Sequence, residues 1–519
     1  MKLLLAGPGT GKTTRIKELV NGQQDLDKIL VISFTNATIQ DLLRSFSDAN
    51  IGITGKNCIT LHKYALKINH QKSLHILSGV EVEILESYAK KFSITFDDLC
   101  KTLECITFEQ MIAQTTAFIK TNPAYLQDLV GDIDLLIIDE FQDFNPTERE
   151  LINLLSTHAK DSIILGDDDQ CIYEFKDADT EGIINLFNDT SVENLIHHNI
   201  CHRCPDCIVD ACSNLININK KRVSKEWKKS GKPGEIIFKQ LRTQEESANL
   251  IFQEIKKIKN IAPDASIMIL SAVEFAVEGV IAVLKEKEVE FTSLWNQKID
   301  LEKMKRVWEI RTILGSKKII NLLFLIHENV KNNKKTIKNI GELLGKKLNF
   351  ETFLNLVENG GFVESDFITL IKSKPSLADV VGIDKYSFLS SYLAEDTLED
   401  DSEKLAKIIA EPLPFNSSGI NIMSIHKSKG LQADYVFMIG MVEGIIPNAL
   451  RGLDTIEAQR RLLFVGMSRT KNKLYLLSTV EWDGKYVNRV DKKQFRFDFR
   501  SRKYHGRTSM FIAELKITI

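Results

Sequence analysis

The sequence predicts an α/β protein built on parallel sheets, and three features of the chain support this prediction. A glycine-rich loop follows a short apolar strand near the start of the chain, at Leu3–Leu5. Further short apolar runs recur along the chain, and segments of helical character separate them. Two adjacent carboxylates directly follow one of these runs, Leu135–Ile138. Short buried strands that alternate with helices are typical of a parallel sheet covered on both faces.

The apolar runs fall into two sets, which indicates two sheets. The runs are Leu3–Leu5, Ile29–Ser33, Leu135–Ile138 and Ile163–Leu165 in the first set, and Glu235–Phe238, Ile267–Leu270, Tyr435–Ile439 and Leu474–Leu477 in the second. Segments with few strand-like runs interrupt both sets, so we expect helical insertions at residues 66–125 and 296–415. The predicted sheet domains are therefore residues 1–65 with 126–197, and residues 198–295 with 416–519.

Length and composition favour a multidomain globular protein. The chain has 519 residues, of which 43% are hydrophobic, enough for more than one packed core. Its 8 cysteines are few and unevenly spaced, which suits a reducing compartment better than a disulfide framework. The apolar stretch at Met1–Leu5 is too short for a secretory signal, and no run is long enough to span a membrane. We expect a cytoplasmic protein without a membrane partner.

The net charge of −2 conceals clusters of basic residues, because 68 Lys and Arg almost cancel 70 Asp and Glu. These clusters lie at Lys220–Lys232, Lys331–Lys338 and Arg496–Arg507. The overall charge neither demands nor excludes nucleic acid as a partner. Each cluster by itself is more often a solvated face than a binding site.

The loop after the first strand has the pattern of a nucleotide-binding P-loop, Ala6-Gly7-Pro8-Gly9-Thr10-Gly11-Lys12-Thr13-Thr14. Its glycines lack side chains where backbone N–H groups must approach phosphate oxygens. Lys12 would reach the terminal phosphates, and Thr13 would ligate Mg²⁺. The other residues of the predicted cradle are Gly9, Thr10, Gly11 and Thr14. The usual pattern has glycine in place of Ala6. By itself the loop indicates only an NTPase.

The acidic segment after Leu135–Ile138 reads Asp139-Glu140-Phe141-Gln142-Asp143. It places two carboxylates at the carboxyl edge of a sheet, where ligands of α/β proteins bind. Asp139 is the candidate for Mg²⁺ coordination, and Glu140 is the candidate for polarising the attacking water. A solvated acidic turn, the other interpretation, fits poorly after so apolar a strand.

A later strand leads into Gly166-Asp167-Asp168-Asp169-Gln170-Cys171-Ile172-Tyr173-Glu174-Phe175. The amide of Gln170 beside two aromatic residues suits a motor in which phosphate sensing shifts a stacked base. Packing of Tyr173 and Phe175 in a core is the alternative.

Taken in this order, the three motifs resemble those of superfamily 1 helicases of the UvrD/Rep group. Further segments match the family's motifs Ia (Ser33–Ala37), Ib (Thr60–His62), IV (His202–Pro205), V (Ser424–Leu431) and VI (Glu457–Leu462 with Val465–Thr470). The motifs run from residue 6 to residue 470. The resemblance implies two RecA-like P-loop domains, each with a helical insertion.

The resemblance also implies roles for single residues. Arg203 and Arg469 would be arginine fingers that reach the γ-phosphate, while Gln142 and Gln170 would couple phosphate state to domain closure. The positions that would line the nucleic-acid track are Phe34, Thr35, Asn36, His62, Tyr173, Phe175 and His426. Two nucleotide-facing positions depart from the family pattern: His202 replaces a tyrosine that stacks on adenine, and Gln432 replaces a glutamate.

The function that the resemblance implies is an ATP- and Mg²⁺-dependent helicase that moves 3′ to 5′ on single-stranded DNA and acts at junctions with duplex DNA. The alternative is an ATP-driven translocase or switch that serves as the motor subunit of a nuclease, repair or defence complex without processive unwinding by itself. A kinase or GTPase would lack the paired arginines and motif V.

Four cysteines also allow an iron–sulfur or zinc interpretation, and they are Cys201, Cys204, Cys207 and Cys212. They overlap motif IV and the helix predicted after it. We therefore interpret them as small core side chains.

Overall fold

A computed structural model describes residues 1–68, 75–77, 82, 85–86, 89–90, 95–102, 105–130, 132–174, 177–295, 415–448 and 456–517. These residues fall into two compact units, of which the larger holds two six-stranded sheets. The insertion predicted at residues 296–415 lies outside the described residues except for Phe415, and Phe175 lies outside them as well.

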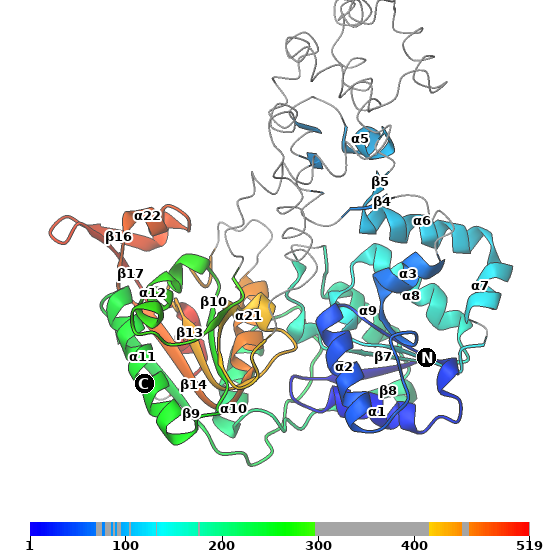
Figure 1. Cartoon of the computed structure of the whole chain (residues 1–519), viewed down its shortest axis with the longest axis horizontal. Helices are drawn as coiled ribbons and strands as arrows, with labels where there is room; N and C mark the ends of the chain where they lie inside the picture. Colours follow the sequence, from blue (N-terminus) through cyan, green and yellow to red (C-terminus); the bar gives the residue numbers. More distant parts are fainter. Residues whose placement is uncertain are drawn as a thin grey trace, which may run out of the picture. The chain divides into compact units, whose positions relative to one another are not determined.

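The first sheet is parallel throughout. Its strands in spatial order are β3 (Cys58–Thr60), β2 (Ile29–Ser33), β6 (Leu135–Ile138), β7 (Asp161–Gly166), β1 (Lys2–Ala6) and β8 (Leu195–His198). One face packs against α1 (Lys12–Asn21) and α2 (Asn36–Asp48), whose buried side chains form a single core with alternate residues of the strands. Side chains that point to the other face, such as Leu136 and Ile164, are equally buried. Helices therefore cover both faces, as the apolar runs predict (Figure 1).

The second sheet is also parallel throughout. Its strands in spatial order are β11 (Thr292–Ser293), β12 (Ile420–Ser424), β10 (Ile267–Ser271), β13 (Ala433–Ile439), β14 (Thr470–Thr479) and β9 (Glu235–Leu241). On one face, Ile267 and Ile269 share a core with α11 (Gln244–Ile261) and α12 (Glu278–Glu286). On the other, Met268 and Leu270 share a core with α10 (Asp206–Ile216), α21 (Ile456–Met467) and α23 (Met510–Glu514). The period of two along β10 thus places each side chain in one of two cores.

The remaining described α-helices and strands belong to both units. In the larger unit they are α3 (Leu61–Ile68), α7 (Pro123–Val130), α8 (Pro146–His158), α9 (Glu181–Asp189), α22 (Gly484–Val487) and an antiparallel sheet of β15 (Glu481–Trp482), β17 (Lys503–Gly506) and β16 (Phe495–Asp498). The smaller unit has α5 (Phe96–Thr102) and the parallel pair β4 (His75–Ile76) and β5 (Cys105–Ile106). Helix α6 (Phe108–Thr121) begins in the smaller unit and continues into the larger one. None of the described helices combines the length and apolarity needed to cross a membrane.

The predicted α/β fold class is confirmed, and every predicted apolar run forms part of a strand. The domain boundaries stay a prediction. The sequence did not reveal β12, because the polar residue Asn421 interrupts its apolar pattern. Asn421 is fully buried, and its side chain exchanges hydrogen bonds with the backbone of Asn416 at 2.8 and 2.9 Å. A buried amide with both partners satisfied is compatible with a strand inside the sheet.

Candidate active site

The P-loop lies between the end of β1 at Ala6 and the start of α1 at Lys12. Its backbone takes left-handed conformations at Gly9 (φ 71°) and Gly11 (φ 92°), which glycine adopts without strain. A Cβ atom at Gly9 would lie 2.5 Å from Cβ of Arg203, so a side chain is excluded there. Ala6 pairs within the sheet and does not have a positive φ angle, which explains why alanine can replace the usual glycine.

Loops that follow strands of both sheets line a cleft of about 410 Å³. The cleft brings together most of the predicted site residues: Gly9, Gly11, Lys12, Thr13, Thr14, Phe34, Thr35, Asp139, Glu140, Gln170, Tyr173, His202, Arg203, Gln432 and Arg469. Thr10 is buried instead, and its hydroxyl donates to the Gly7 carbonyl at 2.8 Å, so it braces the loop. Gln142 is fully buried behind the lining residues.

Two adjacent carboxylates lie where β6 ends, and their environments differ. Lys12 Nζ lies 3.1 Å from Glu140 Oε1. Burial would raise the pKa of Glu140, but the charges of Lys12 and Lys429 outweigh it and hold this pKa at about 2. Burial and the charge of Glu140 raise the pKa of Asp139 to about 7. Glu140 also has a left-handed backbone (φ 56°), which is uncommon outside glycine and typical of functional positions.

The surroundings of Asp139 fit a hard cation. This side chain is only 4% exposed, and its Oδ1 atom has no hydrogen-bond partner among the described residues. An unsatisfied buried carboxylate oxygen is costly unless a cation or a donor occupies the space beside it. Thr13, in the first turn of α1, lines the same cleft. Carboxylate and hydroxyl oxygens are ligands that Mg²⁺ accepts.

Two glutamines connect Glu140 with Arg469 through a continuous series of hydrogen bonds. Gln142 Nε2 donates to Glu140 Oε2 at 2.5 Å, and Gln142 Oε1 accepts from the backbone N–H of Asp167 at 2.9 Å. Gln170 Nε2 donates to Asp167 Oδ2 at 2.7 Å. Arg469 Nη2 then donates to Gln170 Oε1 at 3.2 Å. A change in charge at Glu140 therefore has a structural route to Arg469.

The two predicted arginine fingers lie at different depths. Arg469 is 2% exposed, and its Nε donates to the Val465 carbonyl at 2.8 Å. Burial and the like charge of Arg203 lower the pKa of Arg469 to about 9. Arg203 Nε donates to Gln432 Oε1 at 3.0 Å, so the amide that replaces the family's glutamate still accepts from this guanidinium. The backbone N–H of His202 donates to the Gly9 carbonyl at 2.9 Å, which holds this segment against the P-loop.

The predicted track residues group only in part. The rings of Phe34 and Tyr173 lie 5.5 Å apart, and Tyr173 Oη donates to the His426 carbonyl at 3.5 Å. His62 Nε2 lies 3.1 Å from Glu148 Oε1, and neither His62 nor His426 lines the cleft. Asn36 is exposed at the start of α2, outside the cleft lining.

Comparison with known protein families identifies the class of protein. Residues 1–98 and 83–191 match the UvrD/REP helicase N-terminal domain, and residues 302–481 match the UvrD-like helicase C-terminal domain. The chain belongs to the UvrD/Rep-type helicases of superfamily 1. It is therefore an enzyme that hydrolyses ATP, and the predicted family is confirmed.

Similar curated proteins align with this helicase over most of its length. ATP-dependent DNA helicase PcrA of Leuconostoc citreum is 23% identical over 91% of this chain and 79% of its own. A probable DNA helicase II homolog of Mycoplasma capricolum subsp. capricolum is 23% identical over 95% of this chain and 86% of its own. ATP-dependent DNA helicase Rep of Buchnera aphidicola subsp. Acyrthosiphon pisum is 25% identical over 91% of this chain and 92% of its own.

The helicase has a buried cation in the cleft that sequence reasoning missed. Lys429 Nζ donates to both carboxylate oxygens of Asp143, at 2.5 and 2.7 Å, and to the Gln170 carbonyl at 2.7 Å. The same ammonium lies 5.3 Å from the ring centre of Tyr173. Motif V contains two lysines, Lys427 and Lys429, and their spacing does not show which one faces the cleft. The fold decides it, because Lys427 Nζ donates to the Leu294 carbonyl at 2.5 Å.

Three of the four cysteines around motif IV pack as core residues, as interpreted, and Cys207 is partly buried against the same core. Cys201, Cys204 and Cys212 are fully buried in the core that α10 shares with the second sheet. Among the described residues, the group with suitable metal-binding spacing is Asp167, Asp168 and Asp169, and it contains no cysteine.

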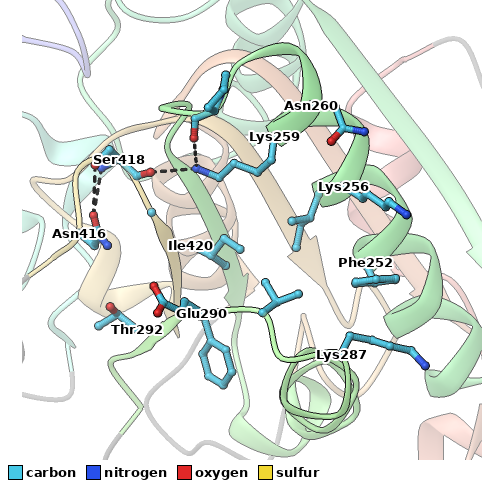
Figure 2. A pocket seen from close by; sticks show the side chains of 15 residues that line it. Phe252, Lys256, Lys259, Asn260, Lys287, Glu290, Thr292, Asn416, Ser418 and Ile420 are labelled. Carbon is cyan, nitrogen blue, oxygen red and sulfur yellow. Dashed lines mark hydrogen bonds between the residues drawn. The ribbon is translucent and has the colours of Figure 1, made fainter.

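A larger cavity of about 790 Å³ lies elsewhere, beside α11 and the start of β12 (Figure 2). Lysines line this cavity, but the ammonium of Lys259 donates hydrogen bonds to the carbonyls of Pro263, Ala265 and Ser418 at 2.7 to 2.9 Å. The P-loop and the carboxylates at the end of β6 do not line this cavity. The smaller cleft is therefore the candidate active site.

Proposed function

We propose that this helicase acts on DNA, moving 3′ to 5′ along a single strand and unwinding at junctions with duplex DNA. The observation that supports coupling of ATP hydrolysis to movement along a strand is the position of Lys429, which lines the nucleotide cleft and lies over one ring of the pair formed by Phe34 and Tyr173. Its ammonium bonds to Asp143 and to the Gln170 carbonyl while lying over the Tyr173 ring. The printed names of PcrA and Rep, as DNA helicases, support DNA as the track.

The P-loop would hold the phosphates of ATP through the backbone of Gly9–Thr14. Lys12 neutralises Glu140 at 3.1 Å in this structure. A bound triphosphate carries more negative charge than one carboxylate, so it would draw the Lys12 ammonium to itself. Glu140 would then lose one of the two cations that hold its pKa at about 2, so its carboxylate would become a better proton acceptor for orienting and activating water.

The residues that would hold Mg²⁺ are Thr13 and Asp139, because the buried Asp139 Oδ1 atom has no other partner among the described residues. When bound, Mg²⁺ supplies positive charge beside the phosphates and polarises them as a Lewis acid. Asp139 must be ionised to ligate the ion, since only the carboxylate form offers this charge.

Arg203 and Arg469 would stabilise the charge that develops on the transferred phosphoryl group. Both arginines line the cleft. Arg203 lies in the loop after β8, and Arg469 follows the end of α21. Gln142 and Gln170 would report the state of the phosphates, since their hydrogen bonds connect Glu140 with Arg469. His202 and Gln432 complete the nucleotide-facing set that we propose.

The single strand would cross the two sheets near Phe34, Tyr173 and His426, together with Thr35, Asn36, His62 and Phe175. Stacking of bases on aromatic rings is indifferent to sequence and contributes about 1–3 kcal/mol per base. Lys429 contacts both the Tyr173 ring and the Gln170 backbone. Displacement of a base stacked on Tyr173 would therefore shift the Lys429 ammonium and, through it, the position of Gln170.

An unwinding assay on partial duplexes tests this proposal. Duplexes with a 3′ single-stranded tail should be unwound in the presence of ATP and Mg²⁺, whereas duplexes with a 5′ tail of equal length should not. The Glu140→Gln variant serves as the inactive control. Unwinding from 5′ tails would refute the direction. Movement on single strands without unwinding of either duplex would favour the alternative, a motor subunit that needs a partner.

A further inference from the structure

One lysine of the basic run Lys220–Lys232 is buried rather than solvated. The side chain of Lys225 is 11% exposed, and its Nζ atom lies 2.9 Å from Asp167 Oδ1 and 2.8 Å from Asp169 Oδ2. It also donates to Asp168. The expectation of a solvated face is therefore wrong for this residue. The neighbouring Arg222 is also largely buried and forms a two-pronged pair with Asp169 at 2.8 and 3.0 Å.

The three aspartates are not a vacant metal site. Their carboxylate oxygens lie within 4.8 Å of one another, which is close enough for a shared cation. Lys225 and Arg222 already supply two positive charges to this cluster. Buried charges of one sign must be neutralised by partners, and here side chains of the same protein do so.

Asp167 divides its carboxylate between Lys225 and the sensor glutamine. Oδ1 faces the Lys225 ammonium at 2.9 Å, while Oδ2 accepts from Gln170 Nε2 at 2.7 Å. A side-chain amide has a donor end and an acceptor end, so whichever end bonds to Asp167 decides what the other end offers. With Nε2 held by Asp167, Oε1 is the end that accepts from Arg469 at 3.2 Å. The reversed amide would present an N–H group to a guanidinium, which is a donor only.

Without Lys225, the Asp167 carboxylate would lose the cation that it contacts directly. Asp167 is fully buried, and among the described residues Lys225 is the cation that forms an ion pair with it. Asp167 Oδ1 would then keep the backbone N–H of Asp169, at 3.2 Å, as its remaining donor among the described residues. A carboxylate oxygen held by that one bond is free to turn, and Asp167 then no longer fixes which end of the Gln170 amide faces Arg469.

We propose that Lys225 is a positioning residue that fixes the orientation of the Gln170 amide through Asp167 and thereby holds Arg469 in its catalytic place. The inference rests on the proposed roles of Gln170 and Arg469. The segment around Lys225 is well anchored for this task. Arg461 of α21 donates to the Lys221 carbonyl at 2.7 Å, and Trp227 Nε1 donates to the Pro8 carbonyl at 3.1 Å. Lys225 therefore sits between the helix that ends before Arg469 and the P-loop.

The test uses a charge-balanced variant of the full chain, Lys225→Met with Asp168→Asn. Replacing Lys225 alone would leave three buried aspartates with only Arg222, and the protein could fail to fold. The second change removes one carboxylate that does not contact Gln170, while Asp167 loses its cation. Lys229→Met is the matched control, because Lys229 lies in the same run but is 49% exposed and pairs with Asp210. Lys225→Arg tests rescue by another cation.

The measured quantity is ATP turnover on saturating single-stranded DNA. We expect the charge-balanced variant to lose about tenfold in kcat while KM for ATP changes by less than about threefold. In a Gln170→Ala background the same two changes should alter kcat by less than about twofold, because the amide they orient is gone. Lys225→Arg should keep more of kcat than the charge-balanced variant, and Lys229→Met should match the wild type. Thermal melts of all variants verify folding.

Two outcomes would overturn the inference in distinguishable ways. If the loss in kcat is the same with and without Gln170, Lys225 does not act through that amide, and the proposed role of Gln170 stands. If Gln170→Ala itself turns over ATP like the wild type, the role proposed for Gln170 fails, and the inference fails with it.

Discussion

Replacing Arg469 by lysine tests the proposed arginine finger while keeping a positive charge. The Arg469 guanidinium uses its Nε for the Val465 carbonyl at 2.8 Å and its Nη2 for Gln170 Oε1 at 3.2 Å and Ser468 Oγ at 2.8 Å. A planar guanidinium has enough N–H groups to keep these hydrogen bonds and still direct one N–H group at a phosphoryl oxygen. A single ammonium on a flexible chain cannot hold all these positions at once.

The expected loss follows from the loss of one preorganised donor. Such a donor is worth about 10²–10³ in kcat, which corresponds to roughly 3–4 kcal/mol of barrier. We therefore expect Arg469→Lys to lower kcat by about a hundredfold or more. Binding of ATP should change by less than about tenfold, because the positive charge is retained and the effect belongs to the transition state.

Arg460→Lys is the matched control for this prediction. Arg460 lies on α21, the helix that ends two residues before Arg469, and is also buried, at 8% exposure, but its partners are Glu514 and Asn219. It does not line the cleft. Its replacement should lower stability to a similar degree while kcat stays within about threefold of the wild type.

The assay is steady-state ATP hydrolysis on saturating single-stranded DNA, with nucleotide affinity measured separately by titration. The reasoning is refuted if Arg469→Lys keeps kcat within about tenfold of the wild type, since one tenfold step is only about 1.4 kcal/mol. In that event Arg203 would be the next candidate. Equal losses in both variants would instead show that damage to α21, and not a finger, explains the effect.

Three further predictions concern single side chains. Glu140→Gln should lower kcat by about 10²–10⁴-fold yet still bind ATP, because Lys12 no longer pairs with a carboxylate; near-normal turnover would contradict the role of Glu140. Trp227→Phe removes the hydrogen bond to the Pro8 carbonyl and should raise KM for ATP by about fivefold; an unchanged KM would show that this bond does not shape the loop. Asp168→Asn should increase the free energy of unfolding at pH 8. Burial raises the pKa of Asp168 from 3.8 to about 6, so the free-energy cost of ionising this side chain in the folded state builds up between those two pH values and is complete at pH 8. The gain in Asp168→Asn, up to about 3 kcal/mol, should therefore vanish near pH 4 in urea titrations, and equal gains at both pH values would contradict it.

The parts of the fold that sequence reasoning predicted are those whose physical cause is local. Apolar runs such as Ile267–Leu270 become strands because both of their faces are buried, and this leaves an uninterrupted hydrophobic pattern. The P-loop and the carboxylates after β6 were predictable for the same reason, since each motif is contained in one strand and the loop after it. The strand β12 was missed because the polar residue Asn421 interrupts its apolar pattern. Asn421 is polar because its side chain forms hydrogen bonds with the backbone of Asn416 in a neighbouring loop.

The contacts that connect these motifs depend on pairs of residues far apart in the chain. Lys429 meets Asp143 and Gln170 only once β6, β7 and the loop after β12 lie at one cleft. Neither the spacing within motif V nor the pattern of charge shows which lysine is buried. Sequence reasoning therefore predicted most of the residues that line the cleft, but it predicted neither Lys429 nor the hydrogen bonds through which one residue contacts another.

Lys225 shows how part of this information could still be obtained from sequence. Asp167, Asp168 and Asp169 directly follow a buried strand, and all three are buried in the structure. Three buried carboxylates cannot all remain charged without cations nearby, so such a triplet requires basic partners elsewhere in the chain. The basic run Lys220–Lys232 then has a reason to contain buried members, whereas the charge count alone favours a solvated face. Which of its lysines is buried is decided by the fold, because the loop after α10 passes the end of β7 with Lys225 directed at the triplet.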